Sequence, residues 1–115
     1  MTRGDVRPAR LDPAEGSEQA GVRPVVVVSR DAINAASPVV IVVPCMTRRR
    51  GRRLYPSHVL LSAPEGGLKA DSVALAEQVH AIAITRLGPV WGSLSPASLR
   101  RLERALLIAM DLPGQ

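Results

Sequence analysis

Two polar residues stand beside apolar runs, where a strand can hold a side chain in a fixed place. Arg23 comes directly before Pro24 and four valines, and Thr47 stands at the end of a second β-branched run. A guanidinium group binds phosphate oxygens through a planar fork of donors, and a nearby hydroxyl can donate a further hydrogen bond. Together they could stabilise the phosphorane formed when a ribose 2′-hydroxyl attacks its neighbouring phosphate. Taken singly, such residues are more often a surface charge and a turn residue.

An arginine-rich run follows Thr47 directly. Residues 48–53 read Arg-Arg-Arg-Gly-Arg-Arg, which is too charged and too short for a core element and predicts a loop. This loop could contact a nucleic-acid backbone, with strong salt dependence, or it could be a solvated charged loop. We favour contact with phosphates because the run starts at the residue after Thr47.

The net charge of the whole chain is positive, like that of the arginine-rich run. The chain has 15 basic and 10 acidic residues, a formal charge of +5, and Lys69 is its single lysine. Arginine keeps its charge at any ordinary pH, so the balance points to phosphate-bearing or acidic partners. A compositional preference for arginine explains the ratio of arginine to lysine equally well, but it does not explain the cluster.

Other kinds of chemistry have little support in the sequence. Cys45, His58 and His80 are scattered and lack the paired spacing of metal ligands, so no metal or cofactor is expected. No glycine-rich phosphate loop and no Gly-x-Ser-x-Gly elbow is present. Counting residues alone leaves a serine–histidine–acid triad open.

The single cysteine and the lack of long apolar runs indicate a cytoplasmic protein. Cys45 has no partner for an intramolecular disulfide, which fits a reducing compartment. The first ten residues are polar and lack a signal-peptide core. The longest apolar run, at 39–46, is too short to span a bilayer. We therefore expect no membrane segment.

The order of predicted elements is that of a small, mainly β (α+β) domain covering residues 1–115. A first strand leads into a loop centred on 16–21. Strands are predicted at 24–29, at 39–43 (ended by Pro44), and at 58–62, 72–75 and 78–84, with a kink between the last two. Turns are predicted at 31–38 and 64–67. A helix capped by Ser95 should end near Asp111. This predicts a small antiparallel barrel or curved sheet closed by a C-terminal helix.

Several segments, in order, resemble the MazF/PemK family of toxin endoribonucleases from type II toxin–antitoxin modules. The most specific is the block GSEQAGVRP at 16–24. The others are GDV at 4–6, LDP at 11–13, VPCMT at 43–47, YP at 55–56 and DSVALAEQV at 71–79.

The resemblance implies an SH3-like, CcdB/PemK-type barrel of antiparallel strands with a C-terminal helix, acting as a homodimer. It also implies sequence-specific, metal-independent cleavage of single-stranded RNA to a 2′,3′-cyclic phosphate and a 5′-hydroxyl, which inhibits translation and growth. The implied partner is an acidic, MazE-like antitoxin that folds along the dimer groove.

The family's catalytic residues fall on Arg23, which would neutralise the phosphorane, and on Thr47, which would bind a phosphate oxygen. Further residues are predicted to contact substrate: Ser17, Glu18 and Gln19 in the loop over the site, Ser29, Asn34, His58 and Gln78 near strands, and Arg48, Arg49 and Arg50 in the basic loop. The basic loop, Met46, His80 and Ala83 depart from the family pattern, so the resemblance leaves the cleavage sequence open.

Two other functions stay open at this point. One is a CcdB-like toxin that poisons gyrase by binding, and the other is a non-catalytic RNA-binding module of the same fold. The presence of both Arg23 and Thr47 favours the nuclease.

Overall fold

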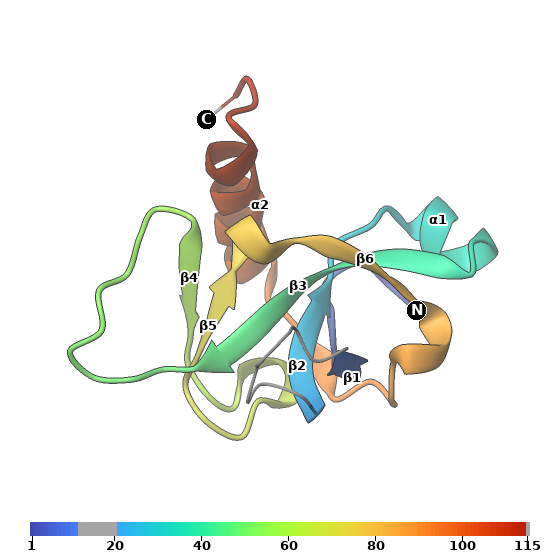
Figure 1. Cartoon of the computed structure of the whole chain (residues 1–115), viewed down its shortest axis with the longest axis horizontal. Helices are drawn as coiled ribbons and strands as arrows, with labels where there is room; N and C mark the ends of the chain where they lie inside the picture. Colours follow the sequence, from blue (N-terminus) through green and yellow to red (C-terminus); the bar gives the residue numbers. More distant parts are fainter. Residues whose placement is uncertain (12–20, 115) are drawn as a thin grey trace.

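The computed structural model describes residues 1–11 and 21–114. Within them, a seven-stranded, strongly curled sheet has the order β4-β5-β3-β2-β1-β7, and β6 pairs with β3 outside this path (Figure 1). The described strands and helices are β1 (Asp5–Leu11), β2 (Gly21–Val27), α1 (Asp31–Ala36), β3 (Val39–Thr47), β4 (His58–Leu61), β5 (Ser72–Leu75), β6 (His80–Ala83), β7 (Gly92–Ser93) and α2 (Pro96–Met110), with short 3-10 turns η1 (Glu65–Gly67), η2 (Ala76–Gln78) and η3 (Ile84–Arg86).

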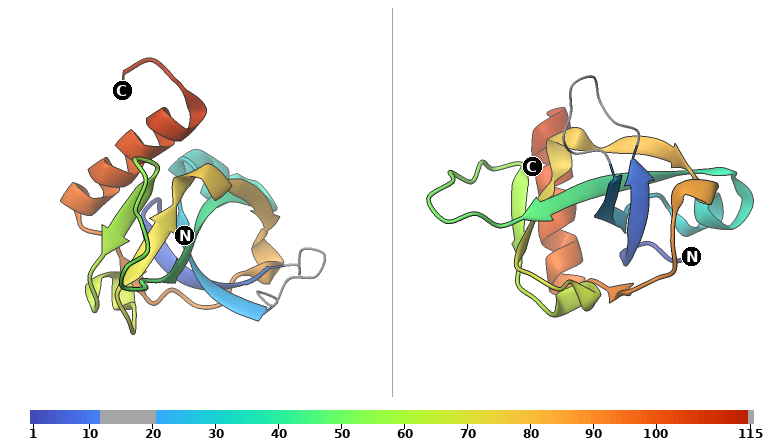
Figure 2. Two further views of the ribbon diagram at one scale, coloured as in Figure 1. Left: turned by 60° about the vertical axis from the view of Figure 1, so that its left-hand side comes forward. Right: turned by 60° about the horizontal axis from the view of Figure 1, so that its bottom comes forward.

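Strand β3 connects the two parts of the sheet. One edge of β3 pairs with β2, from Val42 opposite Val27 to Pro44 opposite Val25. The other edge pairs first with β6 and then, over residues 45–47, with β5. Because β3 changes partners along its length, the sheet curls around it into the half-barrel of Figure 2.

The expected end of this strand at Pro44 is wrong, since β3 continues to Thr47. Proline lacks an N–H and normally interrupts a ladder. Here Pro44 is the last β3 residue paired with β2, and the next residue, Cys45, pairs with Ala74 of β5 on the other edge. The missing donor therefore falls where one ladder ends, and the strand can continue.

The valine run of β2 is buried on both faces, as a run without polar alternation predicts. Val26 belongs to one hydrophobic cluster with Val43. Val25 and Val27 belong to a second cluster with Val42. This double burial fixes the register of β2 against β3, because a slip by one residue would exchange the two clusters.

Helix α2 begins and ends as the sequence predicts. Ser95 Oγ accepts a 3.1 Å hydrogen bond from the backbone N–H of Ser98, and Pro96 is the first helical residue. Asp111 ends the helix in the left-handed conformation. Buried Leu102 joins the cluster that holds residues of β4 and β5, so α2 packs along that part of the sheet (Figure 1). Across the described residues, no helix combines the length and apolar character needed to cross a membrane.

One expected turn is instead a short helix. Within 31–38, α1 spans six residues, and its N-cap residue Arg30 makes no side-chain capping bond. The usual sequence signal for a helix start is therefore missing. The strand predicted at 24–29 is β2, which begins earlier, at Gly21, and ends at Val27. β4, β5 and β6 lie within the predicted ranges, and η2 is the kink between the last two. The predicted mainly β fold with a C-terminal helix is confirmed, and residues 16–20 of the predicted loop lie outside the described residues.

Candidate functional site

Arg23 and Thr47 lie at the same end of two neighbouring antiparallel strands. The β2–β3 ladder stops at Val25 opposite Pro44. Arg23 precedes Val25 in β2, and Thr47 follows Pro44 at the end of β3. Beyond this point β3 pairs only with β5, where Thr47 lies opposite Ser72. The start of β2 and the end of β3 therefore flank one end of the sheet, with Arg23 half-buried and Thr47 exposed.

The positive charge of Arg23 interacts electrostatically with Cys45, whose side chain lies in the core. Burial raises the pKa of the Cys45 thiol to about 12, and the nearby Arg23 charge offsets part of that rise. The thiol is therefore neutral at physiological pH and is not a nucleophile. Because Cys45 carries no negative charge, it leaves the guanidinium charge of Arg23 available to an anion.

A cavity of about 410 Å³ lies beside this end of the sheet. We call it the Glu77 cavity. It is lined by Met46, Arg52, Arg53, Tyr55, His58, Leu75, Glu77 and Gln78. A smaller adjoining recess shares five of these residues and adds Thr47, Arg48 and Arg49. The basic loop after β3 forms one wall of both hollows, and it reaches far out from the sheet before it returns to β4 (Figure 1).

Arg48 carries an unpaired donor in this region. Its backbone N–H donates to Asp71 O at 2.8 Å, which anchors the start of the basic loop. One terminal nitrogen of its guanidinium group is buried and has no hydrogen-bond partner among the described residues. A buried donor without an acceptor is costly.

His58 is held in one orientation at the mouth of the Glu77 cavity. The backbone N–H of Tyr55 donates to its Nδ1 at 3.2 Å, so in the neutral ring the proton lies on Nε2. Nε2 is 3.2 Å from Glu77 Oε2, and Ser57 Oγ donates to Glu77 Oε1 at 2.8 Å. The Tyr55 ring meets the His58 ring edge-on at 5.3 Å between centroids.

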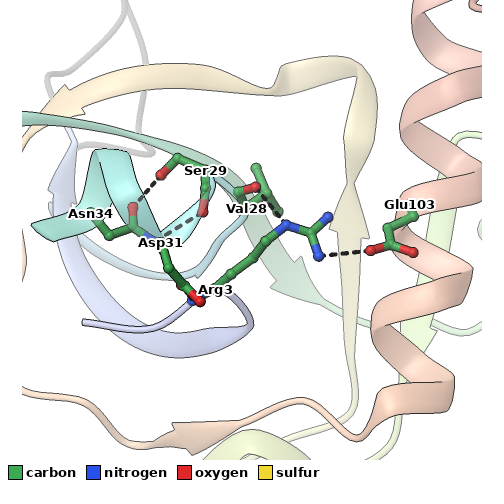
Figure 3. Close-up of polar contacts among 6 residues, drawn as sticks. All are labelled: Arg3, Val28, Ser29, Asp31, Asn34 and Glu103. Carbon is green, nitrogen blue, oxygen red and sulfur yellow. Dashed lines mark hydrogen bonds and ion pairs between the residues drawn. The ribbon is translucent and has the colours of Figure 1, made fainter.

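Ser29 and Asn34 were predicted to contact substrate, but the structure places both in the interior. They are 3% and 6% exposed. Asn34 Nδ2 donates to the backbone oxygen of Ser29 at 2.9 Å, and Ser29 Oγ bonds both Asn34 Oδ1 and the Ile41 backbone N–H. Figure 3 shows Asn34 of α1 joined to Ser29, with the contacts of Arg3 beside them. The pair fastens α1 to β3 and offers no surface to a ligand.

The remaining predicted residues divide into three groups. Thr47, Arg48, Arg49, His58 and Gln78 line the two adjoining hollows. Arg50 is exposed in the same loop but lines neither hollow. Ser17, Glu18 and Gln19 lie outside the described residues.

Several cavity residues were not named individually from the sequence as substrate contacts: Met46, Arg52, Arg53, Tyr55, Leu75 and Glu77. The available signal was position, since Arg52 and Arg53 belong to the basic run and Glu77 directly precedes Gln78. Within the described residues, no group of three or more His, Cys, Asp or Glu side chains is placed to hold a metal ion.

The sequence profile of the PemK-like, MazF-like toxins of type II toxin–antitoxin systems matches residues 2–110. The chain belongs to this family. It is 43% identical over 117 aligned positions to Endoribonuclease MazF9 of Mycobacterium tuberculosis, covering 97% of this chain and 98% of that protein. It is 38% identical over 112 positions to Endoribonuclease MazF of Staphylococcus saprophyticus, covering 97% and 92%.

A solved structure described as an endoribonuclease in complex with its cognate antitoxin, from a mycobacterial species, superimposes with a TM-score of 0.81. It is 24% identical and covers 100% of this chain and 99% of that chain, which shows a shared fold. Together these similarities confirm the predicted MazF/PemK family and, with it, the predicted class of toxin endoribonuclease.

Proposed function

We propose that this MazF/PemK-family chain, acting as one toxin domain over residues 1–115, is a sequence-specific, metal-independent endoribonuclease that cleaves single-stranded RNA. The observation that carries the proposal is the position of Arg23 and Thr47 at the same end of β2 and β3. The half-buried guanidinium of Arg23 and the exposed hydroxyl of Thr47 give this end of the sheet two groups for one phosphate.

The reaction needs no external nucleophile. The ribose 2′-oxygen attacks the adjacent phosphorus and loses its proton, the bond from phosphorus to the 5′-oxygen breaks, and that oxygen gains a proton. The products are a 2′,3′-cyclic phosphate and a 5′-hydroxyl. No water is consumed, so no group for water activation is required.

Arg23 acts mainly through its charge. Negative charge accumulates on the phosphorane oxygens, and a fixed guanidinium in a partly dry site stabilises that charge more than it stabilises the ground state. Arginine is a poor general base because its pKa lies above about 12. Thr47 donates a hydrogen bond to a phosphate oxygen and fixes the position of the phosphate between the strands.

The proposed assembly is a cytoplasmic homodimer that an acidic antitoxin inhibits. The related mycobacterial structure was solved as a complex with its cognate antitoxin. The formal charge of +5 and the basic loop beside Thr47 favour an acidic, MazE-like segment on this surface, where it would exclude RNA. The free toxin would inhibit translation and growth by cutting RNA.

The test is incubation of purified, antitoxin-free protein with a long unstructured RNA in EDTA, followed by sequencing of fragment ends. Discrete cuts with 5′-hydroxyl ends are expected from the wild type, and Arg23→Ala should abolish them while the circular dichroism spectrum stays unchanged. Arg104→Ala is the matched control, since it removes the same charge from an exposed position of α2. Intact RNA from folded wild-type protein, or full cleavage by Arg23→Ala, would refute the proposal. An effect on DNA supercoiling with RNA intact would favour a gyrase poison.

A further inference from the structure

The Glu77 cavity holds a carboxylate on a surface that is otherwise basic. Arg52 and Arg53 form part of its wall, yet Glu77 and Gln78 line it as well. Repulsion from RNA phosphates makes a carboxylate unfavourable at a site that binds only the backbone. A carboxylate beside arginines is suited instead to a ligand with hydrogen-bond donors and acceptors on different edges.

Glu77 is held in place before any ligand binds. Ser57 Oγ donates to one carboxylate oxygen at 2.8 Å, and His58 lies 3.2 Å from the other. The Glu77 side chain is nevertheless 41% exposed, so it remains accessible from solvent. A carboxylate has about four acceptor positions. Two donors inside the protein therefore leave each oxygen able to accept one more hydrogen bond.

The rest of the lining suits a flat ring. Met46 and Leu75 contribute apolar surface, and Tyr55 is 55% exposed, with its ring edge-on to His58. A volume of about 410 Å³ lies within the usual range for small-molecule pockets. Proteins that read single-stranded RNA stack splayed bases on aromatic rings and bond their Watson–Crick edges.

The cavity also adjoins the predicted cleavage site. Met46 lines it and is the residue before Thr47 in β3. A base in this cavity would thus belong to a nucleotide close to the cleaved phosphate.

We propose that the Glu77 cavity is a guanine-specific base subsite, in which Glu77 accepts hydrogen bonds from guanine N1–H and the N2 amino group. This inference rests on the proposed RNA-cleaving function and assigns part of its sequence specificity. Arg52 or Arg53 binds the O6 and N7 edge, the commonest arginine contact to guanine. Tyr55 stacks on the base.

Guanine fits this arrangement better than the other bases. It presents two N–H donors side by side, and one carboxylate accepts both. Adenine and cytosine present an amino group next to an acceptor nitrogen, and uracil presents one N–H between two carbonyl oxygens. In each of these cases an acceptor would face a carboxylate oxygen, which leaves two acceptors in contact without a hydrogen atom between them.

The experiment measures binding without cleavage. A fluorescent 2′-O-methyl oligouridine with one central guanosine cannot be cut, because its nucleophilic hydroxyl is blocked. It is compared with the same oligomer carrying inosine, which lacks only the N2 amino group. Wild-type protein should bind the guanosine oligomer about tenfold more tightly. Glu77→Gln should bind the two equally.

Glu103→Gln is the matched control, because it makes the same change on α2, where Glu103 pairs with Arg3. It should keep the preference for guanosine. Equal binding of both oligomers by wild-type protein would overturn the guanine assignment without any variant having to fold. A preference that persists in Glu77→Gln would overturn the role of Glu77.

RNA cleavage separates this inference from the proposed function. Cut sites that lack guanine would overturn the subsite and leave the nuclease intact. A guanosine preference in protein that cuts no RNA would overturn the nuclease and leave the subsite intact.

Discussion

His58 Nε2 lies 3.2 Å from a carboxylate oxygen of Glu77, although the two residues are 19 positions apart in the sequence. The pairing of β4 with β5 brings them together, because His58 stands opposite Leu75 and the turn η2 then returns the chain towards it. The orientation of Glu77 is thus a property of the sheet.

Replacing Thr47 by valine should lower kcat with little change in KM. Valine keeps the shape and the strand preference of threonine but cannot donate a hydrogen bond to the phosphate. Removal of one such donor lowers rates by roughly 10² to 10³ in comparable sites. Steady-state cleavage of a short fluorogenic RNA measures the effect, and Thr47→Ser should restore most of the rate. A fully active Thr47→Val would exclude a catalytic hydroxyl.

The basic loop should set the salt dependence of RNA binding. Changing Arg48, Arg49 and Arg50 to glutamine removes three charges next to Thr47. Each lost phosphate contact should reduce the slope of log K against log salt by about 0.7 for a single strand. Fluorescence anisotropy with an uncleavable RNA, measured across a salt series, gives the slope directly.

A matched triple variant controls for net charge in that experiment. Arg30, Arg100 and Arg104 are exposed and lie outside the basic loop. Their change to glutamine lowers the charge of the protein equally and should leave the slope nearly unaltered. If both triple variants lowered the slope to the same extent, the binding would depend on total charge and not on the loop.

Asn34→Ala should reduce stability and leave chemistry intact. The variant leaves Ser29, which is buried, without its side-chain partner. An unsatisfied buried polar group costs about 1–3 kcal/mol in the free energy of unfolding. Urea unfolding measures the loss, and kcat/KM at a temperature where the variant is fully folded should match the wild type. Reduced kcat/KM with unchanged stability would return Asn34 to the substrate-binding residues.

Cys45 should make stability decline at alkaline pH. Burial raises the pKa of the thiol from 9.0 to about 12, so between these values the unfolded chain releases a proton that the folded chain keeps. The unfolded state then binds fewer protons, and the free energy of unfolding falls as pH rises. The contribution is complete below about pH 9 and is lost progressively above it. Urea unfolding from pH 7 upwards should show a smaller decline in Cys45→Ala.

Local sequence patterns were sufficient for the elements whose signals are local. The valines of β2 and the Ser95-Pro96 start of α2 each follow a simple rule of burial or capping, and both are confirmed. Helix α1 lacked a capping signal and depends on the buried Asn34. The passage of β3 through Pro44 depends on β5, which lies far along the chain. Tertiary contacts therefore determine both the formation of α1 and the continuation of β3 past Pro44.

In the candidate site, too, some residues could be predicted from the sequence and others depend on tertiary contacts. Arg23 and Thr47 stand in sequence blocks that resemble a known family, so their positions were predicted directly. The burial of Ser29 could not be predicted, because a serine at a strand end looks the same whether it faces solvent or the core. Glu77 was missed because its hydrogen bonds to Ser57 and His58 cross between segments with no shared pattern.

Because β3 pairs with β2, β5 and β6, the strands of the candidate site tolerate changes of length less well than the loop between β3 and β4. An insertion or deletion before Thr47 would shift β3 against β2, β5 and β6 at once and exchange its inward and outward faces. A change of length in the loop between β3 and β4 would leave all three pairings in place. Such loops tolerate insertions and substitutions far better than the strands they join. If the proposed site is correct, this architecture would let a toxin lineage acquire new RNA targets through its loop while Arg23 and Thr47 stay fixed.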